Sequence, residues 1–297
     1  MSIMTHVMSV PLVPADAMAA LKLRAAIDEI CAADPTLGVA IGPINEIVLQ
    51  GAGELHLEIA VDILRRGKGL DFKIGAPQVH YREGITKRIQ WDYTHKRQAG
   101  GVGEFAKVKV RFEPGESGSG FVFENAVRGG SVPEVFIPAV EKGLMAAKET
   151  GVVAGFPLID LKCTLVDCDH HDEDSNERTF EIAASACLRE GLPKAGPRLL
   201  EPMMKVEVAT PQEYLGDVIG DLNSRRGQVQ GMDARGTAQV ITAMVPLSSL
   251  FGYYSTLVSM TRGSATHTMA FSHYEQVPPA YRGPDDDNFP PAIGMRA

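Results

Sequence analysis

The chain of 297 residues is 44% hydrophobic and 22% charged, the balance of a soluble globular protein that is long enough for two or three domains. It has neither an apolar run approaching the ~18 residues of a membrane span nor a signal-peptide pattern, so we expect no membrane partner and a cytoplasmic location. The formal net charge of −8 argues against a protein that binds nucleic acid over its whole surface, and local basic patches are the remaining candidates.

Residues 6–76 are predicted to form one unit in the order strand, helix, strand, strand, helix, strand. Asp16 can cap the first helix, Asp34-Pro35 stops it, and Gly42-Pro43 is a hairpin signal. The expected strands are 6–13, 39–41, 46–49 and 72–74, and the second helix is 54–66. Apolar residues at helical spacing are Met18, Leu21, Leu23, Ile27 and Ile30 in the first helix and Leu55, Ile59 and Ile63 in the second. This order is the split βαβ arrangement of a ferredoxin-like fold.

Residues 77–199 are predicted to form an α+β unit, because a run of strands precedes the helices. The expected strands are 79–83, 85–93, 106–112, 121–125 and 159–167, and the expected helices are 135–150 and 183–190.

A third unit over 200–277 repeats the order of the first. Thr210-Pro211 is a helix start, and Gly227 should stop that helix just after Arg226. The other expected elements are strands 203–209, 229–233, 237–246 and 266–274 and a helix over 248–261. Residues 278–297 are acidic and rich in proline, which predicts a loosely attached tail.

The stretch 95–107 places basic side chains directly before a cluster of glycines. Lys96 and Arg97 suit a phosphate-rich partner, and Gly100, Gly101 and Gly103 allow backbone N–H groups to approach a ligand. The alternative is a flexible hairpin tip without a ligand.

The polar run 170–177 lies between two apolar segments and begins with His170 and His171. Histidine beside carboxylates suits general acid–base chemistry, but no nucleophile motif accompanies it, and a solvated loop that presents histidines to a partner is favoured. Donors such as the histidines and Asn176 can reach ribose and phosphate. A metal-dependent hydrolase that uses Cys168, His170, His171 and Asp172 is the alternative of a different class. The four irregularly spaced cysteines are expected to be free and buried, and no metal ligand is expected.

Arg225 and Arg226 end the first helix of the third unit. They suit either the negative end of the helix dipole or a phosphate contact, and the sequence does not separate the two. Gly51-Ala52-Gly53 lacks the Lys-Ser/Thr of a P-loop, and this motif occurs nowhere in the chain. We therefore expect no cofactor and no GTPase activity in this chain.

Nine sequence motifs together resemble the C-terminal three domains of elongation factor G, the bacterial or mitochondrial ribosomal translocase. They span roughly residues 6–277 in the order found in that family. The motifs cover residues 53–59, 81–83, 95–101, 137–143, 174–177, 199–208, 216–222, 225–227 and 245–253.

The resemblance implies three domains. Two ferredoxin-like domains (1–76 and 200–277) flank an α+β domain (77–199) that is similar to the second domain of ribosomal protein S5. In the family the middle domain is an arm whose tip consists of two loops, here 100–104 and 170–177, with His171 as the tip histidine. The implied partners are rRNA, the mRNA–tRNA of the decoding region, the factor-binding site and the GTPase domain of the parent factor. The resemblance implies a monomer, with GTP and Mg²⁺ held in the GTPase domain that this chain lacks.

Three features depart from the family pattern. The GTPase and second domains are absent, Val102 and Glu104 replace residues that are often small or basic and Gln, and the tail lacks the usual terminal helix. Glu104 is expected to repel RNA. These departures keep open a divergent paralogue that acts in ribosome recycling.

Overall fold

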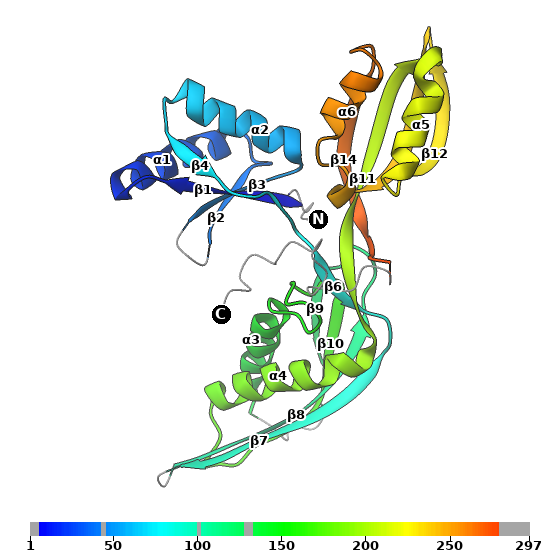
Figure 1. The fold of residues 1–297 in the computed structure, drawn as a ribbon. Helices are drawn as coiled ribbons and strands as arrows, with labels where there is room; N and C mark the ends of the chain where they lie inside the picture. The colour runs from blue at the N-terminus through cyan, green and yellow to red at the C-terminus, as the bar shows by residue number, and fades with distance from the viewer. Residues whose placement is uncertain (1–5, 43–45, 100–101, 128–132, 279–297) are drawn as a thin grey trace. The chain divides into compact units, whose positions relative to one another are not determined.

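The computed structural model of the chain describes residues 6–42, 46–99, 102–127 and 133–278 (Figure 1). The chain divides into two compact units, one with Met1–His80 and Glu201–Glu275 and the other built mainly from Tyr81–Leu200, which is called the middle domain below. Helices and three mostly antiparallel sheets make up both units, so the expected α+β class is confirmed. Among the described residues, every helix is too short or too polar to cross a membrane.

The first sheet has the ferredoxin-like arrangement expected for residues 6–76. Its elements are β1 (Met8–Pro14), α1 (Ala17–Ala33), β2 (Gly38–Ile41), β3 (Ile47–Gly51), α2 (Glu54–Asp62), η1 (Ile63–Gly67) and β4 (Phe72–Ile74). The strand order is β2-β3-β1-β4, and β5 (Gln78–Val79) also pairs with β1. Asp16 caps α1 as predicted, because its Oδ1 accepts a hydrogen bond of 2.7 Å from the backbone N–H of Ala19.

The second helix buries a different face from the one that its largest apolar residues suggest. Leu55, Ile59 and Ile63 are all exposed, and the core instead receives Leu57, Ala60, Val61 and Leu64. Its α-helical part ends at Asp62, and the π-helical turn η1 continues the segment to Gly67, close to the expected end at residue 66. A helix with apolar residues on two faces has no single buried side by periodicity alone.

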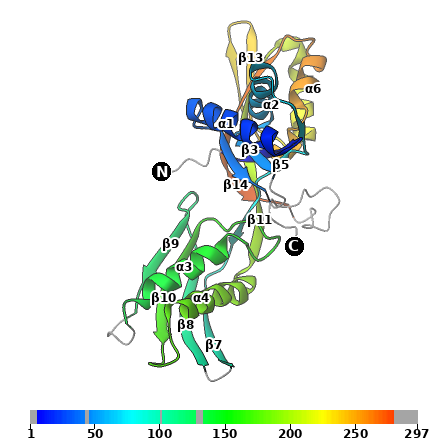
Figure 2. The same ribbon diagram turned by 90° about the vertical axis from the view of Figure 1, so that its left-hand side faces the viewer.

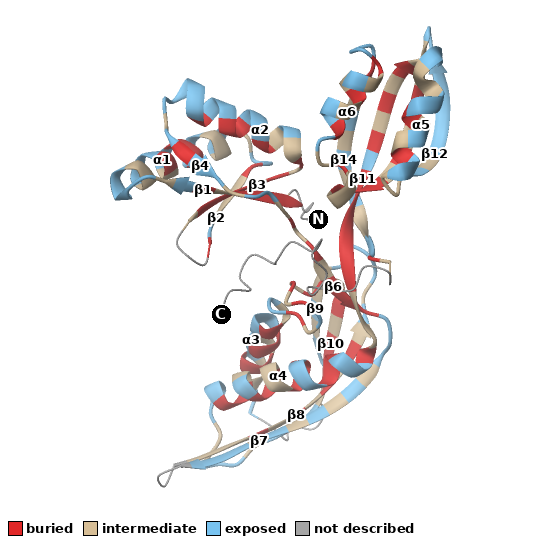
Figure 3. Cartoon of the chain, in the orientation of Figure 1, coloured by how far each residue is buried: buried red, intermediate tan, exposed pale blue. Residues whose placement is uncertain are grey.

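The middle domain packs two helices on one side of a four-stranded sheet (Figures 1 and 2). Its elements are β6 (Arg82–Ile85), β7 (Ile89–Ala99), β8 (Val102–Pro114), β9 (Phe121–Asn125), α3 (Phe136–Lys148), β10 (Leu161–Asp169), α4 (Glu177–Gly191) and η2 (Leu192–Ala195). The sheet order is β7-β8-β10-β9, with β9 and β10 parallel. In Figure 3 the outer sides of both helices are largely exposed, and the core lies between them and the sheet.

The β7–β8 hairpin is longer than the sequence pattern suggested. Pairing continues from Ile89↔Phe112 to Ala99↔Val102, whereas the predicted strands ended at residue 93 and began at residue 106. Residues 94–98 are polar and mostly exposed on both sides of the strand. Alternation of apolar and polar side chains stops where the helices no longer cover the sheet, but backbone pairing does not need it.

A buried carboxylate fastens the middle domain at its first strand. Glu83 is 0% exposed, and its two carboxylate oxygens accept four backbone N–H groups, from Val152 (2.5 Å), Val153 (2.9 Å), Ala154 (2.7 Å) and Phe156 (3.1 Å). The backbone of Glu83 adds two hydrogen bonds to the same segment, with Pro157 and Ile159. The segment after α3 is therefore held by both the side chain and the backbone of a single residue, Glu83.

The third sheet repeats the ferredoxin-like order that was expected for residues 200–277. Its elements are β11 (Pro197–Pro211), η3 (Gln212–Tyr214), α5 (Leu215–Ser224), β12 (Gln228–Arg235), β13 (Ala238–Pro246), η4 (Leu247–Ser249), α6 (Tyr253–Met260) and β14 (Thr266–Gln276). The strand order is β12-β13-β11-β14, and the first residues of β11 pair with β6 instead.

Both ends of α5 differ from the prediction. Thr210-Pro211 belongs to the end of β11, and the turn η3 precedes the helix. At the other end Arg226, not Gly227, takes the left-handed conformation, with φ of 64°. A left-handed residue after a helix usually is glycine, and the contacts of Arg226 described below account for the exception.

Candidate functional site

The histidine loop, residues 170–176, lies beside the outer part of the β7–β8 hairpin. The backbone N–H of Phe105 donates to the carbonyl of Asp174 at 2.8 Å, and Ser175 Oγ donates to the carbonyl of Phe105 at 2.6 Å. The expected convergence of the two loops is confirmed for these residues, and Gly100 and Gly101 lie outside the described part of the chain.

The histidine loop takes the place of strand β10 where that strand ends. The ladder between β8 and β10 ends at the pair Lys107↔Asp169. Two residues closer to the end of the hairpin, Phe105 of β8 bonds to the histidine loop and no longer to β10. This approach is close at Gly103, where an added Cβ would overlap the carboxylate of Asp174. The absence of a side chain at Gly103 therefore leaves the space that the carboxylate of Asp174 occupies, and a larger residue there would displace this carboxylate. Contact of its amide with phosphate stays a prediction.

The two histidines of the loop have different surroundings. The side chain of His171 is 61% exposed, with its ring edge-on to Phe105 and Nδ1 at 3.5 Å from Asp174 Oδ2. The side chain of His170 is 24% exposed, and its ring centroid lies 6.1 Å from that of Phe136 at the start of α3. His171 is thus the histidine that the loop presents, as the family resemblance implies.

Asn176 is the N-cap of α4. Its Oδ1 accepts from the backbone N–H of Thr179 at 3.0 Å, and Thr179 Oγ1 accepts from the N–H of Asn176 at 3.3 Å, which completes a capping box. The side-chain carbonyl is committed to the helix, so only the amide nitrogen is left to donate to a ligand. This cap also explains why α4 begins at Glu177 rather than near Ala183, where the apolar pattern starts.

The acidic residue Glu104 lies among basic residues near the end of the hairpin and pairs with one of them. Lys96 and Arg97 are exposed, and Arg97 lies directly across the ladder from Glu104. Glu104 Oε2 is 3.0 Å from His95 Nε2, and this hydrogen bond, aided by the charges of His95, Arg97 and Arg178, lowers the pKa of Glu104 below its usual value. The repulsion of RNA that was expected from Glu104 is therefore weakened by its own neighbours.

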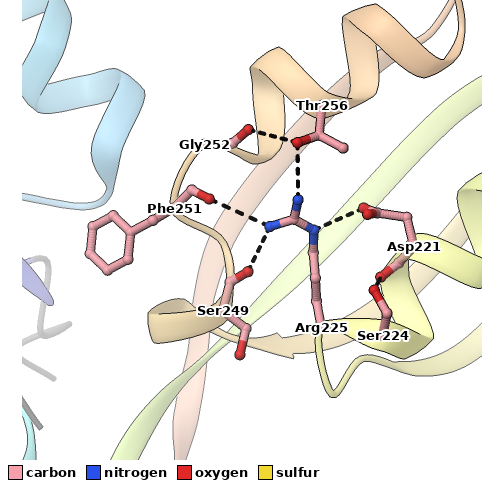
Figure 4. Close-up of polar contacts among 7 residues, drawn as sticks. All are labelled: Asp221, Ser224, Arg225, Ser249, Phe251, Gly252 and Thr256. Atoms are coloured by element: carbon pink, nitrogen blue, oxygen red, sulfur yellow. Dashed lines mark hydrogen bonds and ion pairs between the residues drawn. The ribbon is translucent and has the colours of Figure 1, made fainter. Parts of the chain in front are cut away.

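The guanidinium of Arg225 is used inside its own domain (Figure 4). Nε donates to Asp221 Oδ2 at 2.8 Å, Nη1 donates to the carbonyl of Ser249 at 2.9 Å, and Nη2 donates to Thr256 Oγ1 at 3.1 Å. The same group lies 5.2 Å from the ring centroid of Tyr253, whose burial raises the pKa of its hydroxyl. Arg225 thus joins the end of α5 to the start of α6.

Arg226 pairs with Glu201, which is buried at the start of the third sheet. Nη1 is 3.2 Å from Glu201 Oε2, Nη2 is bonded to Oε1, and Ser248 Oγ lies 3.4 Å from the same carboxylate. The left-handed backbone of Arg226 lets the N–H of Gly227 bond to the carbonyl of Leu222 at 2.8 Å and so end α5, and the ion pair with Glu201 holds the arginine there. A phosphate contact by Arg225 or Arg226 stays a prediction, and the structure gives both of them internal partners.

Replacing Arg225 with alanine should loosen the α5–α6 region. Asp221, the carbonyl of Ser249 and the hydroxyl of Thr256 would lose their donor, a cost of roughly 2–3 kcal/mol. Amide exchange in 215–224 and 253–260, measured by mass spectrometry, should accelerate on the order of 30- to 100-fold. Arg66→Ala is the control, because Arg66 is an exposed residue that pairs only with Asp62 in its own helical segment. Unchanged exchange in Arg225→Ala would show that the guanidinium is not structural.

The metal-site alternative is not supported by the position of its cysteine. Cys168 points into the core of the middle domain, and burial, with added effect from Asp167 and Asp169, raises the pKa of its thiol to about 11. A thiol in this state is a poor metal ligand. Within the described residues, no three His, Cys, Asp or Glu side chains gather as metal ligands.

Sequence reasoning missed the residues that hold the tip together. Phe105 and Ser175 make the contacts between hairpin and loop, and Phe136 brings the start of α3 beside His170. The sequence did carry a signal for Asn176 as the N-cap of α4, because a polar Asp-Ser-Asn run before an apolar helical pattern marks a helix start. Nothing local identifies Phe105 as the partner of a loop 70 residues away.

Comparisons with known proteins agree with this geometry. Three domain profiles of one family match the chain in order: elongation factor G domain III over 4–76, domain IV over 77–196, and the elongation factor G C-terminus over 198–282. A crystal structure of a protein from Thermus thermophilus is similar at a TM-score of 0.74 and 36% identity, covering 92% of this chain and 41% of that one. The chain thus spans less than half the length of this relative, and none of the matched domains is a GTPase domain. The chain therefore belongs to the elongation factor G family, through its domain III, domain IV and C-terminal domain.

Proposed function

We propose that this chain is the ribosome-binding part of an elongation factor G-like translation factor and that it promotes movement of tRNA and mRNA. The observation that supports this proposal is the tip of the middle domain, where the histidine loop is bonded to the outer hairpin and presents His171. The action is mechanical. A stiff arm occupies the decoding region and prevents the tRNAs from slipping back, so no residue of this chain needs to make or break a covalent bond.

The partners proposed for this part are rRNA, the mRNA–tRNA of the decoding region and a GTPase domain of the same factor. GTP and Mg²⁺ would be bound by that GTPase domain, because the chain has no P-loop sequence to cradle phosphates. Ribosome recycling is the alternative within the same class. The pairing of Glu104 with His95 weakens one reason for it, since Glu104 is not a free negative charge at the tip.

Ribosome binding by the purified chain tests this proposal. We expect the chain to compete with a full-length elongation factor G for ribosomes that carry tRNAs, with an affinity that falls as salt rises. The variant Lys96→Ala/Arg97→Ala should bind more weakly, and the slope of log affinity against log salt should shrink by about 1–2, because each phosphate contact contributes somewhat less than one.

Arg88→Ala is the matched control. Arg88 is also exposed and cationic but precedes β7 at the end of the hairpin away from the tip, where it pairs with Glu113. If the two variants lose the same affinity, the tip is not the binding surface. If the wild-type chain does not compete at all, the proposed function fails for this chain.

A further inference from the structure

Ser175 is the only side chain among the described residues whose hydroxyl bonds to both the histidine loop and the β7–β8 hairpin. Its Oγ accepts the backbone N–H of His171 at 2.8 Å and donates to the carbonyl of Phe105 at 2.6 Å. We propose that Ser175 is a positioning residue, which fixes His171 relative to Phe105 of strand β8 so that the histidine loop and this part of the strand move as one unit.

The backbone of His171 is held from both of its polar groups. Its N–H donates to Ser175, and its carbonyl accepts from the N–H groups of Asp174 (3.3 Å) and Ser175 (3.1 Å). These bonds close a tight turn, and the bond from the Phe105 N–H to Asp174 attaches that turn to β8. The exposed ring of His171 is therefore carried on a backbone that has little freedom to move against the strand.

A hydroxyl is the group that this position needs. It must accept from one backbone N–H and donate to one backbone carbonyl at the same time, which serine and threonine can do and alanine cannot. The next residue, Asn176, begins α4 as its cap. Ser175 thus lies where strand, loop and helix meet, and its loss should free the loop without exposing the core.

The consequence for the ribosome rests on the proposed function. A side chain that must contact RNA at one place benefits from being held there in advance, because misplacement by a small distance weakens the contact. Ser175 need not touch RNA itself. Its effect on translocation should pass entirely through His171.

Amide hydrogen exchange of the 297-residue chain tests the positioning role without a ribosome. In Ser175→Ala the amide of His171 should exchange at least about tenfold faster than in the wild type, while Ser175→Thr should keep the protection. Ser185→Ala is the control, because Ser185 makes a comparable bond to the Gly143 carbonyl within the same domain but away from the tip. Unchanged exchange at His171 in Ser175→Ala, or a Thr variant that behaves like the Ala variant, would overturn the proposal.

A double-mutant cycle tests the route through His171. In a full-length factor of this family that carries these domains, Ser175→Ala should slow single-round translocation about three- to tenfold and leave ribosome-stimulated GTP turnover unchanged. In the His171→Ala background the same change should cost less than about twofold. Fully multiplicative effects would show that Ser175 acts independently of His171, which overturns the proposal.

The two measurements separate the two claims. If His171→Ala does not affect translocation, the proposed role of the tip fails. The exchange experiment alone then decides whether Ser175 positions His171.

Discussion

Replacing Glu83 with alanine should destabilise the middle domain by about 3–5 kcal/mol, the range typical of removing one side of a buried charged contact. Four backbone N–H groups would lose their acceptor, and two of these groups, on Ala154 and Phe156, belong to buried residues. Glu83→Gln should cost less, because one amide oxygen can still accept two of the four. The single tryptophan, Trp91, lies in β7, so its fluorescence during urea unfolding reports the middle domain and not the ferredoxin-like sheets.

Glu124→Ala is the matched control for this prediction. Glu124 is a carboxylate of the same domain, but it is half exposed and pairs with Lys162 at the surface, where ion pairs contribute little. We expect a change within about 0.5 kcal/mol for this variant. A Glu83→Ala protein with the same urea midpoint as Glu124→Ala would mean that water replaces the carboxylate and that the segment 152–156 needs no such anchor.

His171→Ala, introduced into a full-length factor of this family, should slow translocation and leave ribosome-stimulated GTP hydrolysis nearly intact. Under the proposed function the reason is spatial, since His171 belongs to the tip and hydrolysis would belong to a GTPase domain outside these residues. Loss of one hydrogen bond to a charged partner costs on the order of 1.5–3 kcal/mol, or roughly one to two decades in rate if the contact is complete in the transition state. Single-round translocation kinetics beside GTP turnover on the same ribosomes measure both.

His170→Ala is the neighbouring control, because its ring packs toward Phe136 and is less exposed than that of His171. It should slow translocation less than His171→Ala. Equal loss of translocation and GTP turnover would indicate defective folding or docking, and no loss of either would remove His171 from the site.

Local signals predicted the parts of the fold that depend on neighbouring residues. Asp16 was expected to cap α1 and does so through a bond to a residue three positions away. The orders of strands and helices in both ferredoxin-like sheets followed from breakers such as Asp34-Pro35 and from alternation. In each case the signal and the structure lie within a few residues of one another.

Features that depend on distant partners were not predictable in the same way. The sequence did not show which face of α2 and η1 is buried, because both faces are apolar. Leu57, Ala60 and Leu64 lie on the buried face, and only the sheet beneath them distinguishes it from the exposed one. The internal role of Arg226 requires Glu201, and the cluster around Glu83 requires a segment about 70 residues further on. The sequence around a charged residue does not indicate a partner that is distant in the chain and close only in the folded structure.

For the candidate site, the family resemblance supplied the two loops and the histidine. The structure gives two of the predicted RNA-contacting residues, Asn176 and Gly103, structural roles as well. Asn176 was predicted as a donor to RNA, and its side-chain carbonyl is a helix cap. Gly103 was predicted for its exposed amide, and its missing side chain makes room for Asp174. The contact of Ser175 with Phe105 was not predictable, because hydroxyls and backbone carbonyls are common and only the fold brings these two together.

The pairing of β6 with the first residues of β11 bears on how the chain folds during synthesis. Arg82↔Leu200 and Ile85↔Pro197 join the start of the middle domain to its end. A growing chain therefore closes this domain in two long-range steps: Glu83 of β6 can bond to residues 152–159 first, and the pairing of β6 with β11 forms only after residue 200 has left the exit tunnel. A chain that is cut short before residue 197 would leave β6 with an unpaired edge, and such edges attract other chains. Synthesis from the N-terminus thus makes the β6–β11 pairing the last strand pairing of this domain, formed after the core residues up to Ala195 have been made.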